Sequence, residues 1–290
     1  MHTVIEKAAV LMDALPFIQK FRGETVVVKF GGSIMDDEDG VRAILNDVAF
    51  MECVGLRPVL VHGGGKMISA RMKAEGLTPR FIQGLRVTDE PAMRIVEHVL
   101  NVEINPRMVE QLETFGCKAR GIHGDDILKV SKHVETDPQT GQLIDWGYVG
   151  DVLQVDVAPI KAFLGAAMCP IVTPLGRGVD RRVYNINADE AASAIACAIG
   201  ARKLVFLSDV PGLLSNPEDP SSVISSVKMA DVEELIRRGV ITGGMLPKIS
   251  GAVNAVRAGV QKVHLIDSAM PHSLLLELFT EKGVGTEILQ

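Results

Sequence analysis

The chain has 290 residues, of which 47% are hydrophobic and 23% charged, a composition typical of a folded protein with a sizeable core. A formal net charge of −6 gives no overall basic surface for nucleic acid or an anionic membrane, so any anion must be bound locally. The four cysteines are far apart and form no C-x-x-C pair, which favours reduced thiols and a cytoplasmic location. We expect no signal peptide and no membrane span, because charged residues interrupt every long apolar stretch.

The first segment is predicted to be an amphipathic helix, because apolar residues recur at helical spacing between Val4 and Ile18. Pro16 lies inside this pattern and predicts a kink or break. The apolar stripe must pack either on its own chain or on another subunit, and the spacing leaves both open.

From Thr25 onward, short apolar runs alternate with amphipathic stretches, which is typical of a mainly parallel sheet with helices on both faces. The runs predicted as buried strands are residues 25–30, 58–61, 117–122, 169–173, 203–207 and 260–266. The stretches predicted as helices are residues 37–54, 91–115, 189–199, 231–238, 246–258 and 273–279. We therefore expect an α/β fold, a three-layer sandwich around a central, mainly parallel sheet.

Two segments interrupt this alternation. Residues 128–155 carry turn-forming clusters between short alternating runs, which predicts hairpins laid over a sheet edge or forming a lid. Residues 175–182 form a polar loop, where we place a boundary between two lobes, although one continuous sheet through both also fits the pattern.

Glycine-rich turns follow the first two predicted strands. Lys29 interrupts a run of valines and is followed by Gly31 and Gly32, and the second strand leads into HGGG at residues 62–65. A buried lysine needs an anion, and bare backbone N–H groups at a strand-to-helix turn suit phosphate. Because the carboxyl ends of parallel strands meet at one edge, the two turns should lie side by side. Neither matches the P-loop or the dinucleotide fingerprint, and a tight turn with a snorkelling lysine is the alternative.

Three further polar groups stand at predicted strand ends or helix starts. Arg86, in GLRVT at residues 84–88, suits a carboxylate or phosphate, although the spacing equally fits a surface arginine. Asn185, Asn187 and Asp189 precede an alanine-rich helix, which Asn187 or Asp189 could simply cap. Lys248 begins another helix, where the dipole disfavours a cation unless an anion lies nearby.

Together these groups suit transfer of a phosphoryl group onto an anionic acceptor, a reaction in which the protein positions reactants and neutralises charge. A carboxylate acceptor is ionised at neutral pH and needs no general base, which agrees with the lack of an obvious catalytic histidine. We assign no metal held by the protein, because no histidine pairs with Glu or Cys at ligand spacing.

These motifs resemble the amino acid kinase superfamily and, within it, the N-acetyl-L-glutamate kinase family. The resemblance runs in order along nearly the whole chain, through VKFGGS (28–33), VHGGG (61–65), GLRVT (84–88), YNINAD (184–189), LSDVPG (207–212) and GGMLPK (243–248). GLRVT and NINAD are the specific motifs, whereas the glycine turns are shared across the superfamily. The resemblance implies the amino acid kinase fold, an oligomerisation helix (1–22), a lobe for the amino acid and dimerisation (23–178) and a lobe for ATP (179–290).

The implied reaction transfers a phosphoryl group from ATP to the γ-carboxylate of N-acetyl-L-glutamate in arginine biosynthesis, with Mg²⁺ carried mainly on the ATP phosphates. By the same resemblance, Lys29 and Lys248 neutralise the transferring group and Asp189 orients both lysines. The remaining implied contacts are Gly64, Gly65, Arg86 and Asn185 for the substrate and Gly31, Gly32, Ser208 and Asp209 for ATP. A side chain at Gly64 is expected to lower turnover more than stability.

The chain also resembles the arginine-inhibited members of that family, in which a helix before the first strand interlaces with a neighbour's helix and links three dimers into a hexamer. The resemblance implies an arginine site at Phe17, His264, Glu277 and Gly283. The alternative is that His264 and Glu277 are ordinary surface or edge residues. A nitrogen-sensing regulatory protein is left open as a partner.

Two other functions compete with this hypothesis. The chain is either another amino acid kinase, acting on carbamate, aspartate or a nucleoside monophosphate, or a non-catalytic arginine sensor. Arg86 argues against the former, and the presence of both lysines and Asp189 argues against the latter. Departures from the family pattern at Lys66, Met67 and Gln83 and in residues 121–126 and 180–182 affect substrate contacts rather than the chemistry.

Overall fold

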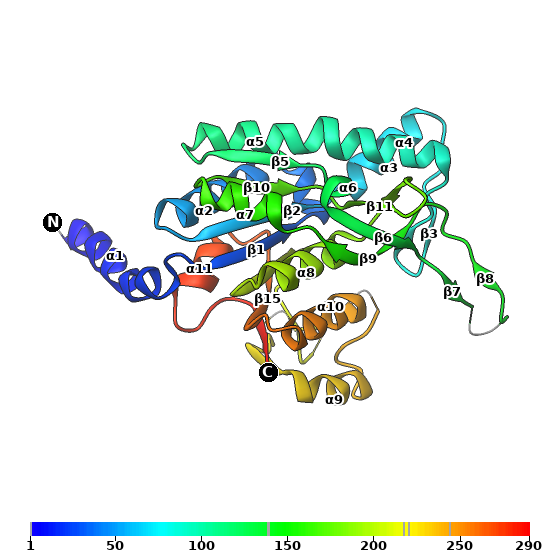
Figure 1. Ribbon diagram of the computed structural model, residues 1–290. Helices are drawn as coiled ribbons and strands as arrows, with labels where there is room; N and C mark the ends of the chain where they lie inside the picture. The colour runs from blue at the N-terminus through cyan, green and yellow to red at the C-terminus, as the bar shows by residue number, and fades with distance from the viewer. Residues whose placement is uncertain (1, 138–139, 217, 220, 244) are drawn as a thin grey trace.

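The computed structural model describes residues 2–137, 140–216, 218–219, 221–243 and 245–290, which form a three-layer α/β sandwich (Figure 1). The eight described strands of the central sheet are, from edge to edge, β14 (Ser226–Lys228), β16 (Thr286–Leu289), β15 (Lys262–Asp267), β13 (Lys203–Ser208), β1 (Thr25–Phe30), β2 (Arg57–His62), β10 (Cys169–Val172) and β5 (Ala119–Ile122). Neighbouring strands run parallel except β15 and β16. All six predicted strands are present, so the predicted fold class is confirmed.

Helices cover both faces of this sheet (Figure 1). One face carries α2 (Glu38–Cys53), α3 (Gly65–Ala74), α4 (Glu90–His98), the π-helical turn η2 (Val99–Ile104), α5 (Asn105–Thr114) and α11 (Ser273–Phe279), while α1 (His2–Phe21) extends from the amino-terminal end of the strands. The other carries α7 (Ala158–Gly165), α8 (Ala188–Ile199), α9 (Val232–Arg237) and α10 (Met245–Arg257), and the short turns η1 (Gly32–Asp36), α6 (Gly124–Ile127) and η3 (Met229–Asp231) lie in connections. No helix in the described part of the chain combines the length and apolar character needed to cross a lipid bilayer.

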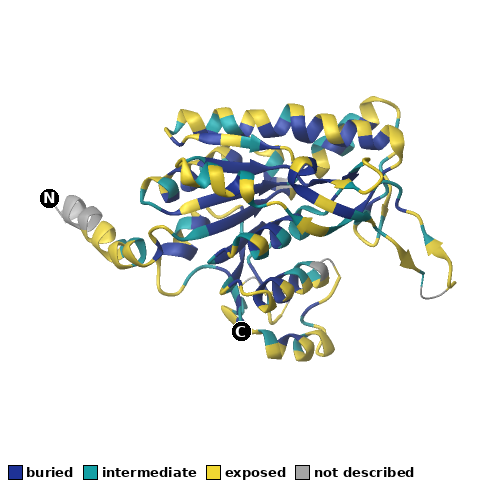
Figure 2. Cartoon of the chain, in the orientation of Figure 1, coloured by how far each residue is buried: buried dark blue, intermediate teal, exposed yellow. Residues whose placement is uncertain are grey.

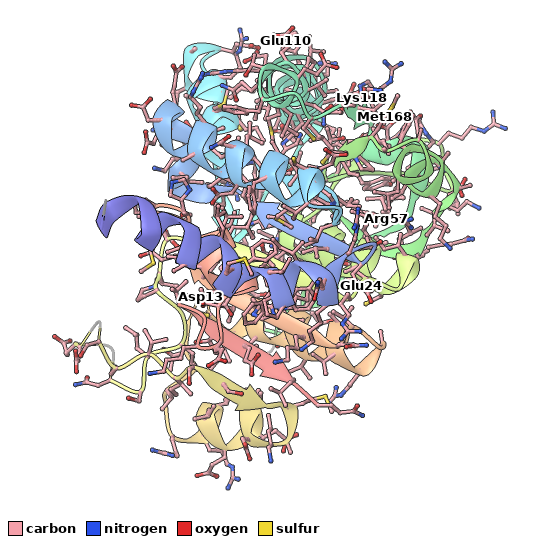
Figure 3. The ribbon with its side chains drawn as sticks, turned by 90° about the vertical axis from the view of Figure 1, so that its left-hand side faces the viewer. Asp13, Glu24, Arg57, Glu110, Lys118 and Met168 are labelled. Atoms are coloured by element: carbon pink, nitrogen blue, oxygen red, sulfur yellow. The ribbon has the colours of Figure 1, made fainter. Side chains whose placement is uncertain are left out.

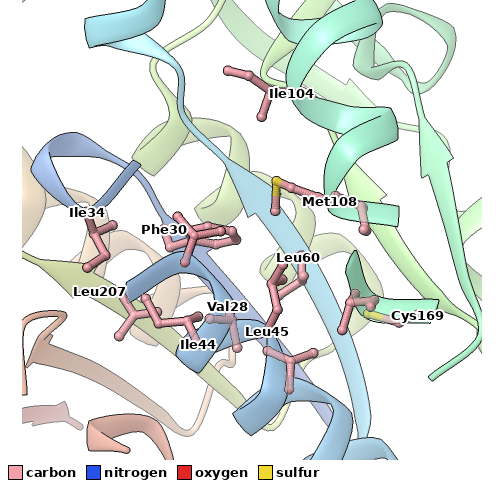
Figure 4. Close-up of a cluster of buried hydrophobic side chains, with 14 of the residues drawn as sticks. Val28, Phe30, Ile34, Ile44, Leu45, Leu60, Ile104, Met108, Cys169 and Leu207 are labelled. Atoms are coloured by element: carbon pink, nitrogen blue, oxygen red, sulfur yellow. The ribbon is translucent and has the colours of Figure 1, made fainter. Parts of the chain in front are cut away.

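Strand β1 is buried on both sides because its side chains alternate between two apolar cores. Val28 and Phe30 pack into the core beneath α2 and α5, which Figure 4 shows in close-up, and Val27 faces the core beneath α8 and α10. Figure 2 shows the resulting band of buried strands between half-exposed helices. Lys29 follows Val27 by two residues, so it emerges at the carboxyl end of the strand on the α8 side.

Residues 128–155 form hairpins, as predicted. A second sheet has the strand order β12 (Val183–Asn185), β11 (Leu175–Gly178), β6 (Leu128–Lys132) and β9 (Gly150–Val155). Two short hairpins, β3 (Phe81–Ile82) with β4 (Leu85–Arg86) and β7 (Glu135–Thr136) with β8 (Leu143–Ile144), extend at one end of the molecule (Figure 1). The main sheet continues from β13 to β1, so it spans both sides of the boundary placed at residues 175–182.

Helix α1 continues from His2 to Phe21 with Pro16 inside it, so of the predicted kink or break the break is absent and the kink stays a prediction. The residues around the proline, Phe17 and Ile18, pack against the body of the protein, and this tertiary contact offsets the lost helical hydrogen bond. Figure 3 views the amino-terminal ends of the strands, marked by Glu24 and Arg57, with α1 crossing this end. The side chain of Val4, at the start of the predicted stripe, lies outside the described residues.

Candidate active site

Asp189 bridges two lysines at the carboxyl ends of the strands. Lys29 Nζ lies 2.7 Å from Asp189 Oδ1, and Lys248 Nζ lies 2.9 Å from Asp189 Oδ2. Burial raises the pKa of the Asp189 carboxyl, but the charges and hydrogen bonds of Lys29 and Lys248 outweigh burial and lower it. Two ammonium groups against one carboxylate leave a net positive charge, which suits the site to an anion.

The local sequence explains why Asp189 is available for this bridge. The side-chain oxygen of Asn187 accepts hydrogen bonds from the amides of Asp189, at 2.8 Å, and Glu190, at 3.4 Å, so Asn187 caps α8. Lys248 stands in the first turn of α10, at the positive end of the helix dipole. The anion that its position requires is supplied by the protein itself, as the carboxylate of Asp189.

The two glycine turns lie side by side, as predicted. A Cβ added to Gly31 would come within 3.1 Å of the Gly63 Cα, so the backbones touch where side chains would normally separate them. Gly32 has a φ of +77° and open space around it, so glycine is favoured there by backbone conformation rather than by close approach. Both turns leave backbone facing the region of Lys29.

Gly64 has apolar side chains close to it, so a substitution there is expected to affect packing as well as turnover. An added Cβ would lie 2.8 Å from the methyl groups of Leu100 and Ile104, which belong to the apolar core. A side chain at Gly64 would therefore displace these methyl groups, and Gly64 also lines the cavity described below, so the expected loss of turnover stays a prediction. Gly65 is more open, since its nearest neighbour would be the Arg86 guanidinium at 3.9 Å.

His62 is fully buried behind these turns and is held neutral. Its Nδ1 lies 2.9 Å from the Gly63 carbonyl oxygen and its Nε2 lies 3.2 Å from Asn105 Nδ2, so Nδ1 donates and Nε2 accepts. Burial outweighs the bond to Gly63 and lowers the pKa of His62 to about 4. This histidine supports the turn and is no proton carrier near neutral pH.

Arg86 is buried, so the surface alternative does not apply. Its Nη2 donates to the Gly65 carbonyl oxygen at 2.6 Å and to Ser69 Oγ at 2.8 Å, and the guanidinium lies 4.7 Å from the centre of the Phe81 ring. Burial lowers the pKa of Arg86 from its usual value. No carboxylate pairs with this arginine among the described residues, so its charge is available to an acidic ligand.

One cavity of about 210 Å³ is lined both by Lys29 with Asp189 and by Arg86. Its walls include most of the predicted substrate and catalytic residues: Lys29, Gly64, Gly65, Arg86, Asn185 and Asp189. Asn185 also donates through Nδ2 to Thr88 Oγ1 at 3.3 Å, which ties it to the strand end that carries Arg86. Ser69 was not predicted, although its position four residues after Gly65 places it on the same helix face.

Comparison with known proteins adds a match to a family model described as the amino acid kinase family, over residues 24–267. The chain belongs to the amino acid kinase family. Two similar curated proteins are the acetylglutamate kinase of Heliobacterium modesticaldum, 44% identical over 295 residues covering 100% of both chains, and that of Symbiobacterium thermophilum, 43% identical over 288 residues covering 99% of this chain and 98% of that one. This family member is therefore an enzyme of the acetylglutamate kinase type.

Solved structures agree on the fold of this amino acid kinase. An N-acetylglutamate synthase from Neisseria gonorrhoeae, complexed with coenzyme A and N-acetyl-glutamate, superposes with a TM-score of 0.85 at 26% identity, covering 98% of this chain and 63% of that one. A carbamate kinase from Giardia lamblia bound to AMP-PNP gives a TM-score of 0.64 at 18% identity, covering 92% of this chain and 98% of that one. The predicted amino acid kinase fold is confirmed.

The predicted ATP contacts are split between two places in this kinase. Gly31 and Gly32 lie at the end of β1, beside Lys29. Ser208 ends β13 and its Oγ lies 3.3 Å from Asp209 Oδ1, while Asp209 lines a separate cavity of about 490 Å³ near α2. No group of three or more metal-ligating side chains occurs within the described ranges.

Three of the four predicted arginine-site residues, His264, Glu277 and Gly283, come together away from the cavity. His264 Nδ1 lies 2.6 Å from Glu277 Oε1, and the amides of Val284 and Gly285 donate to Glu277 Oε2 at 2.6 and 3.0 Å. Burial raises the pKa of Glu277, but these hydrogen bonds outweigh it and lower the pKa to about 2. Gly283 has a φ of +61°, and an added Cβ would lie 2.5 Å from Glu277 Oε2.

Phe17 approaches this region from α1, which contacts α11, but it packs mainly into the apolar core. The structure adds a residue that was not predicted, Lys203, whose Nζ lies 4.6 Å from the centre of the Phe21 ring. Burial, reinforced by the charge of Lys262, lowers the pKa of Lys203 to about 8. A lysine inside a buried strand was the signal that pointed to Lys29, and it applies equally to Lys203.

Proposed function

We propose that this amino acid kinase transfers a phosphoryl group from ATP to the γ-carboxylate of N-acetyl-L-glutamate, in the cytoplasm and as a step of arginine biosynthesis. One observation carries the proposal: a single cavity is lined both by Lys29 and Asp189, whose carboxylate also pairs with Lys248, and by the buried Arg86. The first group suits a phosphoryl group and the second suits a carboxylate, so a dicarboxylate acceptor would meet both.

The lysines would neutralise the transferring group. Each ammonium group has three donors and directs one at Asp189, so further donors are available to phosphoryl oxygens. Asp189 would act by orienting both lysines, and the backbone of Gly31 and Gly32 would bind phosphate oxygens. A carboxylate needs no deprotonation before attack, so no general base is required.

The nucleotide supplies the phosphoryl group and carries Mg²⁺ on its phosphates, which fits a site where cationic side chains surround one carboxylate. Ser208 and Asp209 are proposed nucleotide contacts, together with the glycines after β1. At the acceptor end, Arg86 would bind the α-carboxylate of acetylglutamate, with Asn185, Gly64 and Gly65 completing the contacts. We propose the two-lobe division on the same basis, with residues 23–178 for the acceptor and residues 179–290 for ATP.

The proposal is tested by offering ATP, magnesium and N-acetyl-L-glutamate and trapping the acyl phosphate with hydroxylamine. We expect a hydroxamate that forms only with all three present and is absent with Asp189→Asn. Product with carbamate or aspartate but none with acetylglutamate would instead assign another acceptor. Arginine binding by a chain that forms no product with any acceptor would favour an arginine sensor.

We also propose that arginine inhibits this kinase and that α1 links homodimers into a homohexamer. The ionised Glu277 provides a buried acceptor for a guanidinium, with His264 fixed beside it and Gly283 and Phe17 nearby. Val10 and Leu11 on α1 are each 67% exposed, an apolar surface that a second copy of the helix would cover.

Deleting residues 1–19 should convert hexamers to dimers in light scattering and weaken inhibition by arginine, and a dimeric full-length chain would contradict this. A nitrogen-sensing protein partner stays a prediction.

A further inference from the structure

Trp146, the only tryptophan of the chain, is fully buried, yet neither apolar core of the described residues includes it. It lies in the connection from β8 to β9, beside the β3–β4 hairpin. Its indole Nε1 donates a hydrogen bond to the Ile82 carbonyl oxygen at 3.3 Å. That hairpin carries Arg86 and, with Phe81, forms one wall of the cavity.

The backbone around Trp146 is also hydrogen-bonded to Thr88, which follows Arg86, and to Asn185. The Thr88 amide donates to the Trp146 carbonyl oxygen at 2.8 Å, and the Tyr148 amide donates to the Thr88 carbonyl oxygen at 2.6 Å. On its other side, the Asn185 amide donates to the Tyr148 carbonyl oxygen at 2.9 Å. Residues 146–148 therefore connect the base of the Arg86 hairpin with the strand that ends at Asn185.

The indole is held firmly enough to act as an anchor. The His133 ring meets it edge-on, with ring centres 4.7 Å apart and planes at 73°, and His133 Nδ1 lies 2.6 Å from Asp151 Oδ1. Gly147, with a φ of +73°, brings the backbone so close to Thr88 that an added Cβ would lie 2.2 Å from its carbonyl oxygen. The indole is thus fixed from the second sheet, and its single N–H is directed at the hairpin.

We propose that Trp146 is a positioning residue for the acceptor: its indole N–H holds the β3–β4 hairpin, and thereby Arg86, in the binding position. The inference rests on the proposed function, because Arg86 is assigned to the acceptor there. Trp146 touches no reactant, so its loss should affect acceptor binding and leave the phosphoryl transfer step intact.

Because Trp146 is the sole tryptophan, expression in a tryptophan auxotroph supplied with benzothienylalanine replaces one ring N–H of the chain by sulfur, which removes the donor and keeps a fused aromatic ring of similar shape. In the protein without ligands, we expect amide hydrogen exchange in residues 81–87 to quicken by about fivefold, the effect of losing one hydrogen bond. The Val87 amide, bonded to the Arg80 carbonyl oxygen at 2.9 Å, is a direct reporter. Unchanged exchange in this hairpin would overturn the proposal. Trp146→Phe provides a second variant that keeps an aromatic ring.

In steady-state assays, both variants should raise KM for N-acetyl-L-glutamate by about fivefold, with kcat changed by less than about twofold. Tyr148→Phe is the matched control, because its hydroxyl accepts a hydrogen bond from Arg182 Nη1 at 2.7 Å and, among the described residues, makes no hydrogen bond to the hairpin; its KM should match that of the parent chain. An unchanged KM in the Trp146 variants, or a loss confined to kcat, would refute the positioning role. If the parent chain does not phosphorylate acetylglutamate, the proposed function fails and the exchange measurement still decides the anchor.

Discussion

Asp189 and Glu277 are two carboxylates near the carboxyl and amino ends of the same sheet, the first partly buried and the second buried, and they are surrounded in opposite ways. Asp189 is contacted by two lysines, within 2.9 Å of its oxygens. Glu277 is contacted by His264 and by two backbone amides. Burial lowers the pKa of His264, so these donors are neutral near pH 7.

The difference shows how the surroundings of a carboxylate select its ligand. At Asp189 the positive charges exceed the negative charge by one, so the site favours an anion. At Glu277 the hydrogen bonds satisfy the oxygens without cancelling the charge, and the positive charge that acts on the cluster comes from Lys203. The Asp189 site therefore carries excess positive charge, whereas at Glu277 one lysine offsets one carboxylate.

Replacing one of the two lysines that pair with Asp189 should have the largest effect on the rate. Lys29→Met is expected to lower kcat by about 10²–10³-fold, because one of the two proposed donors to the transferring group is lost. Lys161→Met, a matched change at an exposed lysine on α7, should leave the rate unaltered. Hydroxamate formation measures both, and a Lys29→Met rate near that of the parent chain would contradict the role of the bridge.

The acceptor end of the same cavity should respond through binding. Arg86→Gln removes the charge that we propose pairs with the α-carboxylate, and it should raise KM for acetylglutamate by about 10–100-fold, with a smaller change in kcat. Arg94→Gln, at an exposed arginine on α4, is the control. Equal KM values for the two variants would assign the substrate carboxylate to another group.

Of the two carboxylate sites, the Glu277 cluster should make the stability of the protein depend on acid pH. Its folded pKa of about 2 lies below the usual 4.5, so its contribution is present above pH 4.5 and is lost as pH falls toward 2. Between pH 6 and pH 3 the parent chain should lose about 2 kcal/mol more stability than Glu277→Gln, in urea unfolding followed by circular dichroism. Equal losses in both chains would show that Glu277 is not held ionised.

The smallest effect concerns the turn beside Asp189. Gly64→Ala should lower the free energy of unfolding by about 1 kcal/mol, because the added methyl group meets Leu100 and Ile104 in a filled core. Trimming Leu100 to Val in the same chain should recover part of this loss. Unchanged stability combined with lost turnover would support the expectation that Gly64 serves the chemistry first.

The sequence by itself determined the layers of the fold and the edge of the sheet where the site lies. Continuous apolar runs predict strands buried on both faces, and the period of two in β1 places Lys29 on the α8 side. Glycines after two strands predict adjacent turns, since parallel strands end at a common edge. These features depend on short stretches of chain, so a local pattern is sufficient to predict them.

Only the tertiary structure decided which partners those residues meet. Asp189 bridges lysines that are 160 and 59 positions away in the chain (189 − 29 and 248 − 189), Gly64 meets methyl groups of η2, and Asp209 lines a different cavity from Lys29. The continuity of α1 through Pro16 and the bond from Trp146 to Ile82 likewise depend on packing between distant segments. Contacts of this kind leave no repeating pattern in the sequence, because they follow from how complete layers pack against one another.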